Sequence, residues 1–205
     1  NDLFLQAEDN MYRNKLIESP RMKNDTIQLA MRQLFQKNSM ERQHAERVGR
    51  LCKRIGLALK LGDRALYELE LLGRMHDIGK IGSSGEILNT SRRLNETEWL
   101  EIKRHPEIGY QILRSADEYV HIAESVLSHH ERIDGKGYPR NLRASDIPLY
   151  ARILSVAEAY DSMMNQQSHR LSMSEDEVIG ELYRKSGTQF DGEIVKVFVE
   201  ETLQQ

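Results

Sequence analysis

Apolar residues recur at intervals of three and four along most of the chain, which is the spacing of one face of an α-helix. The longest runs are Val48, Leu51, Ile55 and Leu59; Leu66, Leu69 and Leu72; and Leu149, Ile153, Val156, Tyr160 and Met163. No segment shows the alternation of apolar and polar residues that a half-buried β-strand requires. The pattern therefore predicts an all-α fold, a bundle of helices around one core.

Turn and capping residues divide this pattern into separate helices. The predicted boundaries are residues 62–63, residues 83–85, Asn95 with Glu98, residues 135–139, and Ser174 with Glu177. The two pairs that lie three residues apart have the spacing of a capping box, which marks the start of a helix. Pro148 suits the first turn of the helix that follows Asp146.

The chain has 205 residues, enough for one domain with a sizeable core and an N-terminal extension. We expect a helical extension or linker over residues 1–38 and the main domain over residues 39–205. A helix over residues 11–36 that pairs two chains would make a homodimer. An ordinary packed helix explains the same residues, so both interpretations stay open.

Composition indicates the cellular compartment and excludes some classes of partner. The single cysteine, Cys52, excludes an internal disulfide framework and suits a reducing cytoplasm, and its register with Val48 and Ile55 places it in the core. We find no signal peptide and no apolar run of the roughly 20 residues that cross a membrane, so any membrane tether would lie upstream. A net charge of −3 argues against binding to nucleic-acid polymers.

Histidines and carboxylates gather in two short segments. His76 and Asp77 end one predicted helix, with Lys80 three residues on, and His129-His130-Glu131 precedes the loop that begins at Asp134. Adjacent imidazoles and carboxylates are costly to bury unless something binds them. This pattern indicates metal ligands.

The two segments together resemble the HD-GYP family of bacterial metal-dependent phosphodiesterases, which hydrolyse the second messenger cyclic di-GMP. The resemblance also covers residues 105–109, 137–139, 147–154 and 187–191, so it extends from about His44 to the C-terminus. It implies the helical bundle of the HD superfamily. Five of the seven histidines match positions of the family pattern: His44, His76, His105, His129 and His130.

The resemblance implies a centre with two divalent transition-metal ions, of which Fe, Mn, Ni and Zn are candidates. One ion would be held by His44 and His76, the other by His105, His129 and His130, and Asp77 would bridge the two. Glu158 stands where the family has an aspartate ligand. The longer side chain keeps the charge but shifts the ligand by about one methylene, which weakens the site or changes the preferred ion.

The resemblance also implies residues that contact the substrate. Lys80 would point at a phosphate oxygen, and its alternative is a solvated cation at a helix C-terminus. Gly137, Tyr138 and Pro139 form the signature loop, which would shape the site or contact a partner domain, with Tyr138 as a plain packing residue the alternative. Arg170 keeps a phosphate-contacting cation of the family, whereas Gln167 replaces another.

Other positions depart from the family or need no functional role. Met40 stands where some members have a glutamate for a third metal, so we expect two metals; the neighbouring Glu41 would reverse that expectation. The loop over residues 81–88 is richer in glycine and serine, which predicts a more mobile lid. His121 is expected to be a surface or packing residue, and His169 a structural or weakly substrate-facing one.

The start of the chain has a second, shorter likeness. Residues 7–15 look like the closing helix of a GGDEF (diguanylate cyclase) domain, with an ordinary amphipathic helix as the alternative. The likeness implies an upstream GGDEF or sensor domain as a partner.

Three functions fit these patterns. The first is a cyclic di-GMP phosphodiesterase that uses two metals to activate water. The second is a catalytically weak regulatory module that binds cyclic di-GMP or a GGDEF domain, motivated by Glu158 and Gln167. The third is an HD-type phosphohydrolase that acts on another nucleotide, against which the Gly-Tyr-Pro loop argues.

Overall fold

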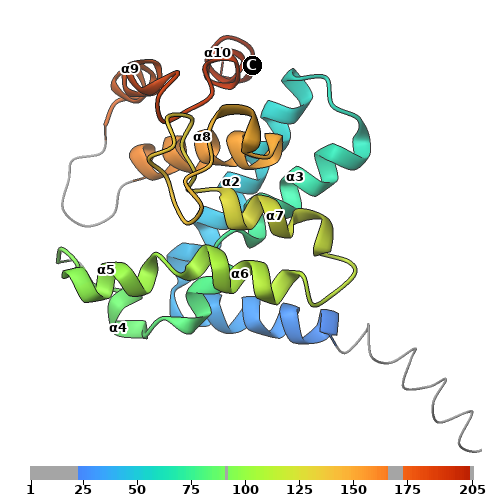
Figure 1. Ribbon diagram of the computed structural model, residues 1–205, viewed down its shortest axis with the longest axis vertical. Coiled ribbons are helices and arrows are strands. Elements are labelled where there is room, and N and C mark those ends of the chain that lie inside the picture. The colour runs from blue at the N-terminus through green and yellow to red at the C-terminus, as the bar shows by residue number, and fades with distance from the viewer. Residues whose placement is uncertain (1–22, 91, 166–172, 204–205) are drawn as a thin grey trace, which may run out of the picture.

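The computed structural model describes residues 23–90, 92–165 and 173–203, and within them the fold is all-α, as predicted. The described part contains no β-strand, only an isolated bridge between Ser186 and Phe190. The elements are a helix over residues 23–37, α2 (Ser39–Ala58), α3 (Asp63–Met75), η1 (Ile78–Gly82), α4 (Gly85–Leu88), α5 (Glu96–Ile102), α6 (His105–Leu113), α7 (Val120–Ser128), η2 (Ala144–Asp146), α8 (Leu149–Met164), α9 (Glu175–Lys185), α10 (Gly192–Val197) and η3 (Phe198–Thr202) (Figure 1).

Helices α2 and α3 form the central pair, and α2 also packs against α8. The pair is close because two glycines face each other: a Cβ on Gly73 would lie 2.6 Å from the Cα atom of Gly49. Any side chain at that point would push the helices apart. The close contact holds the C-terminal end of α3 beside the N-terminal half of α2, and those two ends carry the first candidate site residues.

One apolar cluster joins α2, α3, α7, α8 and α10. Val48, Ile55 and Leu69 are fully buried in it, and so is Cys52, whose burial raises the pKa of its thiol. The expectation that Cys52 belongs to the core is confirmed. The helix over residues 23–37 packs on this cluster through Ile27, which is buried with it. The division of the chain at residue 38 stays a prediction.

Both predicted capping boxes are present. Asn95 and Glu98 exchange hydrogen bonds at the start of α5, and Ser174 and Glu177 do so at the start of α9. Pro148 differs slightly from the prediction because it is the N-cap residue of α8, one position before the first turn. Its fixed φ suits either position.

Helices α9 and α10 lie on one side of α8, and α4, α5 and α6 lie on the other (Figure 1). Residues 81–88, which we expected to form a lid, contain the end of η1 followed by the short helix α4, and Ser84 caps α4. Its mobility stays a prediction. Among the described helices, none is both long and apolar enough to cross a membrane.

Candidate metal centre

Three of the candidate histidines are oriented by the same kind of hydrogen bond, from the ring to a backbone carbonyl. The Nδ1 atoms of His76, His105 and His129 lie 2.8, 2.7 and 2.6 Å from the carbonyl oxygens of Gly73, Ile102 and Val126, each three residues earlier in the chain. A carbonyl oxygen only accepts, so each Nδ1 carries the proton. The Nε2 atoms are therefore the ring atoms left for a ligand, which is the usual arrangement of metal-binding imidazoles.

These side chains meet although their helices are far apart in the sequence. His44 comes from α2, His76 caps α3, His105 begins α6, and His129 follows α7. Their possible ligand atoms form two groups, within each of which every atom lies within 4.8 Å of the others: His44, His76 and Asp77; and His105, His129 and His130. This division is the one that the family resemblance implies, and metal binding by the groups stays a prediction.

Asp77 lies between the two groups. Its Oδ2 atom is 3.0 Å from Nε2 of His76, and its Oδ1 atom is 3.3 Å from Nε2 of His105. The Oδ2 atom and the His76 Nε2 atom are buried, and neither makes a hydrogen bond of good geometry with a described residue, although Lys80 Nζ forms an ion pair with Oδ2 at 2.8 Å. Buried polar atoms normally have partners, and a cation between these two would supply one. The donors present therefore fit a metal ion.

A glycine permits the approach of Asp77 to His105. Gly79, two residues after Asp77, packs so tightly on the start of α6 that a Cβ would lie 1.9 Å from the carbonyl oxygen of His105. Only glycine fits at that distance. The contact of η1 with α6 thus fixes Asp77 next to the second group of histidines.

The pKa values of the residues at the centre are shifted in different directions. Burial acts to lower the pKa of His76, but the Asp77 carboxylate outweighs it and raises that pKa to about 9. Burial lowers the pKa of His105 to about 4, and burial with the neighbouring imidazoles holds the pKa of His129 well below its ordinary value. Burial opposes ionisation of Asp77, but His76 and Lys80 bring its pKa well below the ordinary value. The Asp77 carboxylate beside the neutral imidazoles of His105 and His129 is a suitable ligand set for first-row transition metals.

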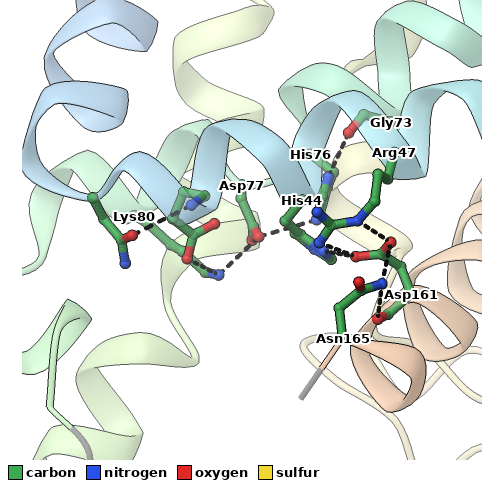
Figure 2. Close-up of polar contacts among 10 residues, drawn as sticks. His44, Arg47, Gly73, His76, Asp77, Lys80, Asp161 and Asn165 are labelled. Carbon is green, nitrogen blue, oxygen red and sulfur yellow. Dashed lines mark hydrogen bonds and ion pairs between the residues drawn. The ribbon is translucent and has the colours of Figure 1, made fainter. Parts of the chain in front are cut away.

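Figure 2 shows a contact between α2 and α8 that the sequence does not predict. The Nδ1 atom of His44 lies 2.7 Å from Oδ2 of Asp161, and Arg47 donates to both oxygens of Asp161, at 2.6 and 2.9 Å. Asn165 also donates to Asp161. The Asp161 carboxylate thereby fixes the orientation of the His44 ring and leaves Nε2 as its nitrogen without this contact. The spacing of His44 and Arg47, one helical turn, was the available signal.

Lys80 is neither solvated nor free. Its Nζ atom pairs with Oδ2 of Asp77 at 2.8 Å and with Oε1 of Glu41 at 3.0 Å, and the two carboxylates raise its pKa against the effect of burial. Lys80, Glu41 and His44 line a cavity of about 300 Å³ that also reaches Met40. The alternative of a solvated helix-end cation is wrong, and contact of Lys80 with a phosphate stays a prediction.

The signature loop lies against the second group of histidines. The Tyr138 ring stacks on the His130 ring with centroids 4.8 Å apart, and Gly137 and Tyr138 line a second cavity of about 450 Å³ together with His129 and His130. Pro139 follows Tyr138 in the same loop and does not line that cavity. A substrate role for the three loop residues stays a prediction.

Two carboxylates next to the paired histidines have structural partners instead of facing them. Glu131 is buried and accepts hydrogen bonds from the backbone N–H groups of Arg140 and Leu142. Asp134 pairs with Arg132. The interpretation of Glu131 as a metal ligand is corrected, because its carboxylate accepts two backbone N–H groups and so fixes the loop.

Glu158 lies on α8 at the wall between the two cavities and lines both of them with Ser162. It belongs to neither group of closely spaced ligand atoms. His121 is a surface residue, as expected, with Nε2 3.8 Å from Glu68. Arg170, Gln167, His169 and the GGDEF-like residues 7–15 lie outside the described residues.

The sequence matches a family model described as HD domain over residues 28–194. The chain is 35% identical over 158 residues to a cyclic di-GMP phosphodiesterase of Thermotoga maritima, covering 76% of this chain and 43% of that protein. It is 34% identical over 163 residues to the 3′3′-cGAMP-specific phosphodiesterase 1 of Vibrio cholerae, covering 79% and 38%. The chain thus spans about two fifths of the length of these curated relatives.

The fold is similar to that of a crystal structure of a cyclic GMP-AMP specific phosphodiesterase of Vibrio cholerae. The TM-score is 0.61 at 21% identity, and the match covers 84% of this chain and 48% of that chain. At this identity the likeness shows the fold alone. The predicted bundle of the HD superfamily is confirmed.

Proposed function

This chain belongs to the HD domain family, and from that premise we propose that it is a metal-dependent phosphodiesterase that hydrolyses cyclic di-GMP. The curated relatives act, by their names, on cyclic di-GMP or on 3′3′-cGAMP. Both are cyclic dinucleotides. The resemblance to HD-GYP phosphodiesterases that the sequence indicates is therefore confirmed, and cyclic di-GMP is the substrate that it predicts.

The observation that carries the proposal is the position of Asp77 between two groups of imidazoles. We propose His44, His76, Asp77, His105, His129 and His130 as ligands of two divalent transition metals, with Fe, Mn, Ni and Zn as candidates. Such a pair supplies a water-derived nucleophile at neutral pH and positive charge for the phosphate oxygens. Glu158 is proposed as a further ligand from the wall between the cavities.

The protein's own residues prepare the centre for an anionic substrate. The three backbone carbonyls accept from the Nδ1 atoms of His76, His105 and His129, so Nε2 is the ring atom left to bind a metal. The lowered pKa values keep His105 and His129 neutral, whereas His76, with its pKa raised to about 9 by Asp77, would lose its Nε2 proton when it binds. Lys80 carries a positive charge at the wall of the first cavity. We propose that its ammonium moves from Glu41 to a phosphate oxygen of the substrate, where a charge-assisted hydrogen bond is short and strong.

A hydrolysis assay on metal-analysed protein tests this function. Purified protein is stripped with a chelator, reloaded with Mn or Fe, and given cyclic di-GMP, 3′3′-cGAMP or a nucleoside monophosphate in parallel. We expect turnover of cyclic di-GMP that needs the metal and none of the monophosphate. Preference for 3′3′-cGAMP would overturn the assignment of cyclic di-GMP, and no turnover of either dinucleotide by metal-loaded protein would overturn the enzyme.

One observation favours the regulatory module as a second candidate. Glu158 stands in place of the family's aspartate and does not join either group of closely spaced ligand atoms. If this weakens the centre, metal-loaded protein should bind cyclic di-GMP with negligible turnover. The substitution Glu158→Asp should then raise turnover, whereas an efficient wild-type enzyme would exclude this candidate.

The proposals on cellular location, partner domains and dimerisation rest on the sequence alone. We propose a cytoplasmic location, consistent with the single buried Cys52, and an upstream GGDEF or sensor domain as partner. Pairing of two chains through the N-terminal helix is an interpretation that cross-linking of full-length protein would test.

A further inference from the structure

The second cavity has a lining that metal binding does not explain. Beside His129 and His130, its wall carries the aromatic rings of Trp99 and Tyr138 and the cations of Lys103 and Lys136. It adjoins the first cavity through Glu158 and Ser162. Aromatic faces next to cations are the features with which proteins hold nucleobases and their phosphates.

The aromatic and cationic groups are arranged in series. Trp99 and Lys103 lie four residues apart, on one face of the end of α5. The Nζ atom of Lys103 is 5.7 Å from the centre of the Trp99 ring and 5.0 Å from that of Tyr138. The Tyr138 ring in turn stacks on His130. These contacts connect the candidate metal ligand His130 with the Trp99 indole through Tyr138 and Lys103.

The indole and the ammonium both lack full partners. Trp99 is 47% exposed at the wall of this cavity, so its ring is open to a ligand there. Lys103 takes part in no ion pair with any described residue, whereas the nearby Arg132 is bound to Asp134. Its cation is therefore available for an anion, while Arg132 is not.

The position of this helix is fixed from both ends. The capping box of Asn95 and Glu98 and the ion pair between Arg92 and Glu98 hold its start. Two residues after Lys103 the chain reaches His105, a candidate ligand at the start of α6. Helix α5, which carries Trp99, is thus positioned relative to the candidate metal centre.

We propose that the second cavity is a nucleobase subsite of the phosphodiesterase, in which a purine of the cyclic dinucleotide stacks on Trp99 and Lys103 pairs with a phosphate oxygen. This inference rests on the proposed function. The inference extends the proposed function by naming Trp99 and Lys103 as residues that bind the substrate in addition to the metal ligands.

Trp99 is the only tryptophan of the chain, so its fluorescence reports on this subsite alone. The full chain, stripped of metal so that no turnover occurs, is titrated with cyclic di-GMP and, in parallel, with ribose 5-phosphate, which has the phosphate but no base. We expect saturable quenching by the dinucleotide and none by the sugar phosphate. No quenching, or equal quenching by both, would overturn the subsite.

Kinetics of metal-loaded variants give a second measure. We expect Trp99→Ala to raise KM about 5- to 150-fold with kcat nearly unchanged, because base stacking on an aromatic ring contributes to binding of substrate and transition state alike. Trp99→Phe should keep most of the affinity. Leu100→Ala is the matched control, since Leu100 is 63% exposed on the same helix and does not line the cavity.

The two proposals fail in different ways. Quenching by cyclic di-GMP without hydrolysis would support the subsite and contradict the enzyme. Normal hydrolysis with an unchanged KM in Trp99→Ala would support the enzyme and overturn the subsite. A KM raised equally by Leu100→Ala would also overturn it, because the effect would then come from the helix and not from the indole.

Discussion

The Oδ1 atom of Asp77 lies 3.3 Å from Nε2 of His105, while the other oxygen of the same carboxylate lies 3.0 Å from Nε2 of His76. One short side chain therefore faces imidazoles from two different helices. A carboxylate placed in this way can bridge two ions. Most of the proposed chemistry depends on this relationship.

Replacing Asp77 by asparagine should remove the bridge while keeping the shape of the side chain. We expect less bound metal per chain and a loss of hydrolysis greater than about 100-fold, because even partners outside the ligand sphere are worth about 10- to 100-fold. Metal analysis and initial rates measure the two effects. Asp146→Asn, in the exposed turn η2, is the control and should behave as wild type. Full metal content in Asp77→Asn would contradict the bridge.

Asp161 is expected to act as a positioning residue through His44. Asp161→Ala should weaken metal binding or activity about 10- to 100-fold, because the His44 ring loses the acceptor at its Nδ1 atom. Asp161→Asn keeps an acceptor oxygen and should recover most of that loss. Metal affinity of the folded protein, measured by calorimetry, separates this role from a purely structural one. A variant that is less stable but binds metal normally would exclude it.

Gly79→Ala should destabilise the fold, because the new methyl group would lie 1.9 Å from the carbonyl oxygen of His105. We expect a loss of about 1–3 kcal/mol or more in the free energy of unfolding, the usual range for an overpacked site. Urea denaturation measures it. Gly180→Ala is the matched control: apart from its chain neighbours and the backbone of its own helix, nothing lies within 4 Å of its Cβ position, so this variant should gain about 0.5–1 kcal/mol. Equal stability of the two variants would contradict the packing.

The start of α5 should lose stability in acid. Arg92 and the backbone N–H of Asn95 lower the pKa of Glu98 from its ordinary value of 4.5 to about 2. A carboxyl group with a lowered pKa in the folded state contributes stability above pH 4.5, and this contribution disappears as the pH falls from 4.5 to 2. Wild type should therefore be more stable than Glu98→Gln at pH 7, with the difference shrinking over that interval. A difference independent of pH would contradict the assignment.

Local signals in the sequence predicted much of the fold. Asn95 with Glu98 and Ser174 with Glu177 were predicted as caps because a capping box depends only on residues three apart. The helical pattern likewise predicted the burial of Cys52. These features need no knowledge of how distant segments meet.

The contacts between distant segments could not be predicted from the sequence in the same way. The pairing of Lys80 with Glu41 joins η1 to α2, and that of Asp161 with His44 joins α8 to α2, so neither follows from local spacing. Glu131 looked like a ligand because it adjoins two histidines. In the folded chain its side chain turns toward the backbone of Arg140 and Leu142, a direction that adjacency in sequence does not determine.

Anomalous scattering from crystals of metal-loaded protein tests the central claim most directly. We predict two peaks, one beside His44 and His76 and the other beside His105, His129 and His130, with the Asp77 carboxylate between them. A single peak, or peaks away from these imidazoles in protein shown to be fully loaded, would contradict the two-metal centre.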